Sequence, residues 1–131
     1  MSPAPFKPLR NLPWWIALWA LAVLLVIVAC LVPSADLPRL PEDSDKLEHA
    51  LAWFLLAASA VQLFRRGRAL CVVAMALLGL GVAIEVAQAL LTTTRSADVF
   101  DVLADGVGLC IGMATAFSPL RDLLLRWQPR R

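Results

Sequence analysis

The residues best suited to chemistry are ionisable side chains that lie within or beside long apolar stretches. Asp98, Asp101 and Asp105 stand at positions i, i+3 and i+7, so on a helix they share one face. Glu85 and Gln88 are spaced i, i+3 and share a face in the same way. Carboxylates grouped in this manner can act as acid and base, or they can bind a cation.

A second group of polar residues precedes another apolar stretch. Asp45 and His49 are spaced i, i+4, with Lys46 between them, and Arg95 is a further cation. His49 can carry a proton near neutral pH. The candidates for acid and base chemistry are Glu85, Asp101 and His49. The same three are the candidate metal ligands, for which Mg²⁺ or Mn²⁺ would suit the oxygen-rich set better than zinc, although no metal or cofactor is expected.

The composition excludes a water-soluble domain. The chain has 131 residues, of which 60% are hydrophobic and 17% are charged. Soluble domains have about 45–50% apolar and about 25% charged residues. The net charge of +2 gives no indication of nucleic-acid binding, and the three cysteines form neither a disulfide framework nor a zinc motif.

Four apolar segments predict four transmembrane helices. They cover residues 14–32, 47–64, 69–91 and 99–117, and all nine prolines lie outside them. We therefore expect an all-α polytopic membrane protein with one domain over residues 1–131. Short connections favour an antiparallel bundle of the four helices, followed by a basic tail over residues 118–131.

Basic residues predict the orientation of these spans. Nine of the twelve Lys and Arg residues lie at one side of the predicted membrane, which the positive-inside rule makes the cytoplasmic side. Both termini should then be cytoplasmic, and the protein should lie in a bacterial inner membrane. The nine residues are Lys7, Arg10, Arg65, Arg66, Arg68, Arg121, Arg126, Arg130 and Arg131.

Depth places the polar residues at one level of the membrane. Glu85 and Asp105 each lie six residues from the outer end of a span, so both should be about 9 Å deep. An ionisable residue at the centre of a spanning helix costs about 2.5–3.5 kcal/mol, so these side chains should face one another rather than lipid. The expected outer-leaflet pocket comprises Asp45, Lys46, His49, Glu85, Gln88, Arg95, Asp98, Asp101 and Asp105.

Glycines predict close helix contacts. Only residues 92–98 separate the last two spans, which should pack as a hairpin through Gly79, Gly81 and Gly106 as well as through Gly108 and Gly112. The Gly108-x-x-x-Gly112 spacing is typical of a close helix contact in membranes. The sequence leaves open whether this contact lies within one chain or between two copies in a homo-oligomer.

Three motifs together resemble the VanZ-like family of small bacterial membrane proteins. They are Asp45-Lys46-x-x-His49, Glu85-x-x-Gln88, and Arg95-x-x-Asp98-x-x-Asp101-x-x-x-Asp105-x-x-Gly108. The resemblance implies a link to resistance against the glycopeptide teicoplanin. Asp105 departs from the pattern, which usually has Asn. A protonated Asp105 would match that Asn, whereas an ionised Asp105 would need Arg95 or a metal beside it.

These residues support three classes of function. The first is binding of a lipid-linked or amphipathic cell-envelope component, such as an envelope lipid precursor or an amphipathic glycopeptide, at the outer pocket. The second is acid and base catalysis on a lipid-linked phosphate or ester. The third is a structural or assembly subunit, in which the polar network only fixes helix positions. Membrane lipids are expected partners in each case, and nucleic acid is not.

Overall fold

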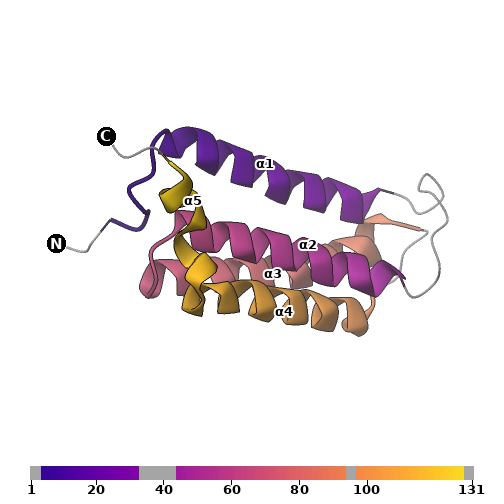
Figure 1. Ribbon diagram of the computed structural model, residues 1–131. Coiled ribbons are helices and arrows are strands. Elements are labelled where there is room, and N and C mark those ends of the chain that lie inside the picture. Colours follow the sequence, from indigo (N-terminus) through magenta and orange to yellow (C-terminus); the bar gives the residue numbers. More distant parts are fainter. Residues whose placement is uncertain (1–3, 33–43, 94–96, 129–131) are drawn as a thin grey trace.

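The computed structural model describes residues 4–32, 44–93 and 97–128. Within these ranges the chain is helical and has no strand, apart from an isolated antiparallel bridge between Phe6 and Phe64. Four long helices lie side by side, and each runs opposite to the one before it (Figure 1). The elements are α1 (Leu12–Leu31), α2 (Ser44–Leu63), α3 (Arg68–Leu91), α4 (Val99–Ala114), the 3-10 turns η2 (Thr115–Phe117) and η3 (Pro119–Asp122), and α5 (Leu123–Trp127).

The helices begin and end near the positions that the sequence indicated, for local reasons. Pro13 stands in the first turn of α1, where a missing backbone N–H costs nothing. Gly67 separates α2 from α3 with φ of 100°, a conformation that glycine adopts without strain. Asp98 caps α4 by accepting a hydrogen bond from the Phe100 backbone N–H at 2.8 Å.

Three of the described helices are long and apolar enough to cross a membrane, namely Leu12–Leu31, Arg68–Leu91 and Val99–Phe117. No residue of α1 is buried by the rest of the chain, and large apolar side chains such as Leu18, Leu21 and Leu25 are exposed along it. Such a surface would be unfavourable in water and is favourable against lipid tails. The protein is therefore a membrane protein.

The remaining long helix, α2, is less apolar because its first turns carry charged residues. It lies between α1 and α4 (Figure 1) and also contacts α3. Its buried residues include Leu56, Ala57 and Trp53, which is completely buried and donates from Nε1 to the Leu77 carbonyl at 3.0 Å. A helix covered by its neighbours needs fewer apolar side chains than one that faces lipid.

Helix α4 packs most closely on α2. The sequence predicted that the last two spans, α3 and α4, pair with each other, and it did not predict the contact with α2. A Cβ at Gly112 would lie 2.6 Å from Ala57 Cβ, and one at Gly108 would overlap the Ala50 carbonyl oxygen. The Gly108 and Gly112 face is therefore occupied by α2 within the chain. A Cβ at Gly79 or Gly106 would meet no atom of the described residues within 4 Å, so within that part of the chain these two glycines do not make the contacts expected of them.

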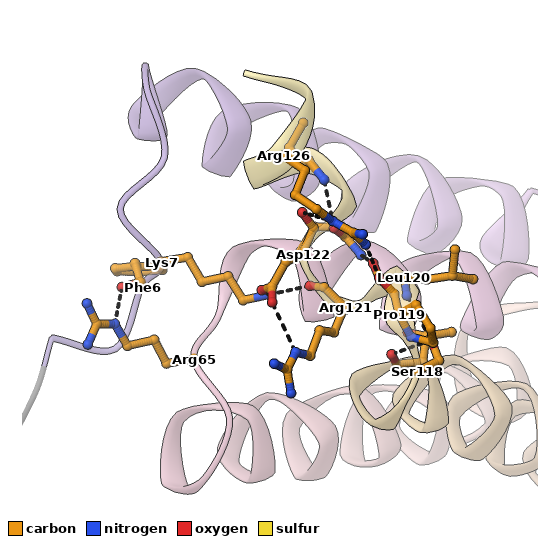
Figure 2. Close-up of polar contacts among 12 residues, drawn as sticks. Phe6, Lys7, Arg65, Ser118, Pro119, Leu120, Arg121, Asp122 and Arg126 are labelled. Carbon is orange, nitrogen blue, oxygen red and sulfur yellow. Dashed lines mark hydrogen bonds and ion pairs between the residues drawn. The ribbon is translucent and has the colours of Figure 1, made fainter. Parts of the chain in front are cut away.

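Polar contacts join the first described residues to the C-terminal segment. Lys7 Nζ lies 2.9 Å from Asp122 Oδ1 and also donates to the Arg121 carbonyl (Figure 2). The Lys7 backbone N–H donates to Leu63 O at 2.8 Å, and Arg65 donates to Pro5 O at 2.9 Å. Lys7 holds the pKa of Asp122 below its ordinary value. We call these contacts of residues 5–7 with residues 63–65 and with Arg121 and Asp122 the terminal clasp.

Candidate functional site

His49 is the centre of a buried polar cluster at the end of the bundle opposite the terminal clasp. It lies in the second turn of α2 and its side chain is 5% exposed. Its Nδ1 lies 2.9 Å from Asp105 Oδ1, and its Nε2 lies 3.9 Å from Asp101 Oδ2. The ring stacks on Trp53 with centroids 6.2 Å apart and an interplanar angle of 16°. Helices α2 and α4 thus fix the imidazole between two carboxyl groups.

Asp105 lies deepest in the cluster, with a side chain that is only 1% exposed. Helix α3 leaves room for it at Gly81, where a Cβ would lie 2.7 Å from Asp105 Oδ2 and 3.4 Å from Trp53 Cζ2. An alanine at this position would force the carboxyl group to shift. The hydrogen-bond partner of Asp105 is His49, at 2.9 Å. The sequence does not predict this pairing.

Lys46 neutralises part of the acidic charge at the start of α4. Its Nζ lies 3.0 Å from Asp98 Oδ2 and 3.4 Å from Asp101 Oδ1. The Phe100 amide and Lys46 hold the pKa of Asp98 below its ordinary value. The two oxygens of Asp101 consequently face different groups, Oδ1 toward Lys46 and Oδ2 toward His49.

Glu85 approaches the cluster from α3 and is 5% exposed as a residue. Its Oε2 accepts a hydrogen bond from the Asp98 backbone N–H at 2.8 Å, which ties the end of α3 to the start of α4. Its Oε1 is buried and has no hydrogen-bond partner within the described part of the chain. Glu85 therefore retains an unused acceptor beside the other carboxyl groups.

Gln88 has a different role from the one its spacing suggested. It is buried, and its Nε2 donates to the Cys30 carbonyl of α1 at 2.8 Å. This bond ties α3 to α1 rather than adding a group to the polar cluster. Arg95, the other cation expected in the pocket, lies outside the described residues.

Asp45 completes the cluster on the exposed side. Its carboxylate, a ring nitrogen of His49 and a carboxylate oxygen of Asp101 all lie within 4.8 Å of one another. Glu85, one of the three candidate metal ligands from the sequence, does not belong to this group, and Asp45 takes its place. A cavity of about 180 Å³ opens beside it between α1 and α2, lined by Val26, Ala29, Cys30, Asp45, Glu48, His49, Ala52 and Trp53.

Two residues that shape this site were not recognised as such in the sequence. Trp53 supports the His49 ring, and Gly81 makes space for Asp105. Both stand four residues from a residue that was singled out, Trp53 after His49 and Gly81 before Glu85. Since residues at i and i+4 share a helix face, that spacing was the available signal.

A larger cavity of about 510 Å³ lies at the other end of α2 and has an apolar lining. It contains none of the carboxyl groups of the cluster. Its lining residues are Trp15, Leu18, Trp19, Ala22, Ser59, Gln62, Leu63, Leu123, Leu124 and Trp127.

The arrangement around His49 can move or hold a proton. Where Nδ1 donates to Asp105, Nε2 carries the free lone pair and faces Asp101, while His49 as a residue also lines the smaller cavity. This is the arrangement of a general base held in one orientation by a buried carboxylate. Comparisons of the chain with protein-family models, with curated proteins and with solved structures found no match.

Proposed function

We propose that this chain is a VanZ-like membrane protein of the bacterial inner membrane with four spans and cytoplasmic termini. The fourth span is α2, whose length of 20 residues suits a bilayer and whose buried face packs mainly against α4, while its charged residues Asp45, Lys46 and Glu48 are exposed at one end. The basic residues of the terminal clasp and of the α2 to α3 connection support a cytoplasmic location for that end. The His49 cluster then lies toward the outer leaflet.

The cluster serves to bind the head group of a lipid-linked or amphipathic cell-envelope component. The observation that carries this proposal is the buried His49, Asp101 and Asp105 group beside a cavity of about 180 Å³. A cavity between helices that combines the polar groups of Asp45, Glu48 and His49 with an otherwise apolar lining can accept a head group while the lipid tail stays in the bilayer.

The charge of the cluster limits which head groups suit it. Within the described part of the chain, the cluster comprises two basic groups, Lys46 and His49, and five carboxyl groups, which belong to Asp45, Glu85, Asp98, Asp101 and Asp105. Hydroxyl and amine groups can donate hydrogen bonds to these oxygens, whereas an unneutralised phosphate would be repelled. A glycolipid precursor or an amphipathic glycopeptide such as teicoplanin fits this chemistry, in line with the family resemblance.

The His49 and Asp105 pair favours one alternative, a membrane-embedded acid and base enzyme. Asp105 orients the imidazole, and His49 lines the cavity, from which the ring could accept a proton from water or from a hydroxyl group. The substrate would be a lipid-linked ester, or a lipid-linked phosphate whose charge is neutralised. Glu85 and Asp101 would then supply the second acidic or basic group.

A binding and turnover assay separates these functions. Purified protein in nanodiscs of neutral lipid is incubated with an isotope-labelled polyprenyl-linked sugar, and both retained label and released product are measured. The test variant is Glu85→Gln, whose amide oxygen can still accept from the Asp98 N–H, so the fold is retained. The control is Asp122→Asn, which also removes one carboxylate but at the opposite end of the bundle.

Binding predicts that wild type and Asp122→Asn retain the label while Glu85→Gln retains much less. Release of product by wild type alone would favour the enzyme. The same assay is repeated with labelled teicoplanin in place of the sugar lipid. If wild type retained no more of either compound than empty nanodiscs do, the binding proposal would be rejected, and the role of a structural or assembly subunit would remain.

A further inference from the structure

We propose that Asp45, His49 and Asp101 bind one divalent cation of the Mn²⁺ or Mg²⁺ class. One ligand atom from each residue lies within 4.8 Å of the others. One imidazole nitrogen and two carboxylate oxygens, with water in the open positions, are ligands that such ions accept. This inference goes beyond the proposed function, because it concerns the ion alone and needs no lipid ligand.

The position of His49 relative to Asp101 supports a shared ion. At 3.9 Å, the separation of Nε2 from Asp101 Oδ2 is too long for a hydrogen bond. Two ligands that each lie about 2.0–2.1 Å from one octahedral ion are about 3 Å apart when they are adjacent and about 4 Å apart when they are opposite each other. The gap between these atoms therefore suits an intervening cation.

The surroundings of His49 match those of a metal-bound histidine. Such residues usually donate the second ring N–H to a carboxylate, which fixes the tautomer and increases the basicity of the ligating nitrogen. Here Asp105 is that carboxylate, 2.9 Å from Nδ1, and Gly81 leaves the space in which it lies. A histidine held in this way directs the lone pair of Nε2 toward Asp101.

A second, independent observation is the unpartnered oxygen of Glu85. Oε1 is buried without a hydrogen bond in the part of the chain that the structure describes, and the other oxygen of the same carboxyl group accepts from the backbone N–H of Asp98, one turn before Asp101. A buried acceptor of this kind normally has a donor. Water bound to the cation would supply that donor, and the ion would also offset the excess of carboxyl groups over Lys46 and His49.

Manganese binding can be measured directly. The purified full-length chain, in nanodiscs of neutral lipid at pH 7, is titrated with MnCl₂ while electron paramagnetic resonance records free Mn²⁺. Two variants each remove one carboxylate from the first turns of α2. Asp45→Asn removes a ligand, and Glu48→Gln is the matched control, because Glu48 lines the same cavity but is outside the ligand group.

We expect wild type to bind one Mn²⁺ per chain and to show nitrogen coupling from an imidazole in pulsed spectra. Asp45→Asn should bind Mn²⁺ at least about tenfold more weakly than wild type. The dissociation constant of Glu48→Gln should stay within about threefold of the wild-type value, because solvent and salt screen the exposed charge of Glu48. Asp105→Asn, which removes only the orienting carboxylate, should weaken binding by about 10- to 100-fold.

Two results would overturn the cation site. Equal weakening by Asp45→Asn and Glu48→Gln, without nitrogen coupling, would mean that Mn²⁺ is attracted only to the general acidic charge. Absence of bound Mn²⁺ in wild type would mean that Asp45, His49 and Asp101 do not form a cation site. Neither result affects the lipid-binding assay, which is performed without added metal.

Discussion

At the scale of single residues, the cluster depends on a few buried contacts that tolerate little change. Asp105 is 1% exposed and has His49 as its hydrogen-bond partner. A buried polar group that loses its partner costs about 1–3 kcal/mol. The identity of residue 105 should therefore affect folding through its ability to accept a hydrogen bond, more than through its size.

Two substitutions of Asp105 test this point. Asp105→Asn keeps an oxygen that can accept from His49 Nδ1, so its thermal unfolding in detergent should stay close to that of wild type. Asp105→Leu leaves Nδ1 without an acceptor and should lower the free energy of unfolding by about 1–3 kcal/mol. An Asn variant as unstable as the Leu variant would contradict this account, since it would mean that the charge itself holds the cluster together.

At the scale of the elements, the close approach of α2 and α4 brings the polar residues together. His49 comes from α2, and Asp101 and Asp105 come from α4, so the cluster exists only while these two helices are in contact. Gly108 lies one turn beyond Asp105 and packs against the backbone of Ala50, the residue after His49. The glycine therefore sets the distance between the two helices at the site.

Paired alanine substitutions in α4 test the role of this contact. Gly108→Ala places a Cβ against the Ala50 backbone, which cannot move without separating the helices, and should destabilise by about 1–3 kcal/mol. Gly106→Ala meets nothing within 4 Å and should be neutral or stabilising, by up to about 1 kcal/mol, because alanine favours helix. Thermal unfolding in one detergent would compare them. Equal stability of the two variants would show that α4 does not depend on close packing at Gly108.

At the scale of the whole molecule, the terminal clasp and the His49 cluster occupy opposite ends of the bundle. The clasp connects residues that are more than a hundred positions apart in the sequence, Lys7 and Asp122. It thereby holds the N-terminal segment, the α2 to α3 connection and η3 together (Figure 2). Stability at this end should depend on the charge of Asp122.

The clasp predicts a pH dependence of stability. The pKa of Asp122 is lower in the folded chain than in the unfolded chain. Ionised Asp122 therefore contributes to stability in full above its unfolded pKa of about 3.9, and this contribution is lost as the pH falls through its folded pKa. Asp122→Asn should reduce stability by about 1 kcal/mol between pH 5 and 8, a small effect because the side chain is 34% exposed. Melting curves across pH 3 to 8 should show the two proteins converging below about pH 4. A constant difference down to pH 3 would argue against an ion pair.

Cysteine labelling tests the proposed orientation. The native cysteines, Cys30, Cys71 and Cys110, are first replaced by alanine so that only the introduced thiol can react. A membrane-impermeant maleimide added to intact cells should then modify a cysteine introduced at Ser34 or Thr93, but not one introduced at Gly67 or Gln128. Labelling at Gly67 in intact cells would reverse the orientation and would place the His49 cluster at the cytoplasmic side.

The sequence by itself determined the helical class and the extent of each helix. The apolar stretches over 14–32, 47–64, 69–91 and 99–117 lie within a few residues of the helices in the structure. This succeeded because a backbone in lipid must satisfy its hydrogen bonds within each segment, so length and hydropathy alone locate a helix. The spacing of Asp98, Asp101 and Asp105 also follows directly from helical geometry.

Only the tertiary structure decided which side chains meet. Helical spacing places Asp101 and Asp105 on one face of α4, but it does not state which helix that face contacts. The sequence predicted α3 as the neighbour of α4, whereas in the structure α4 packs mainly against α2. Three contacts follow from the packing of the helices. His49 pairs with Asp105, Gln88 donates to α1 and not to the cluster, and Asp45 lies beside His49. Sequence periodicity fixes directions within one helix, whereas contacts between helices depend on how side chains of both fill the same space.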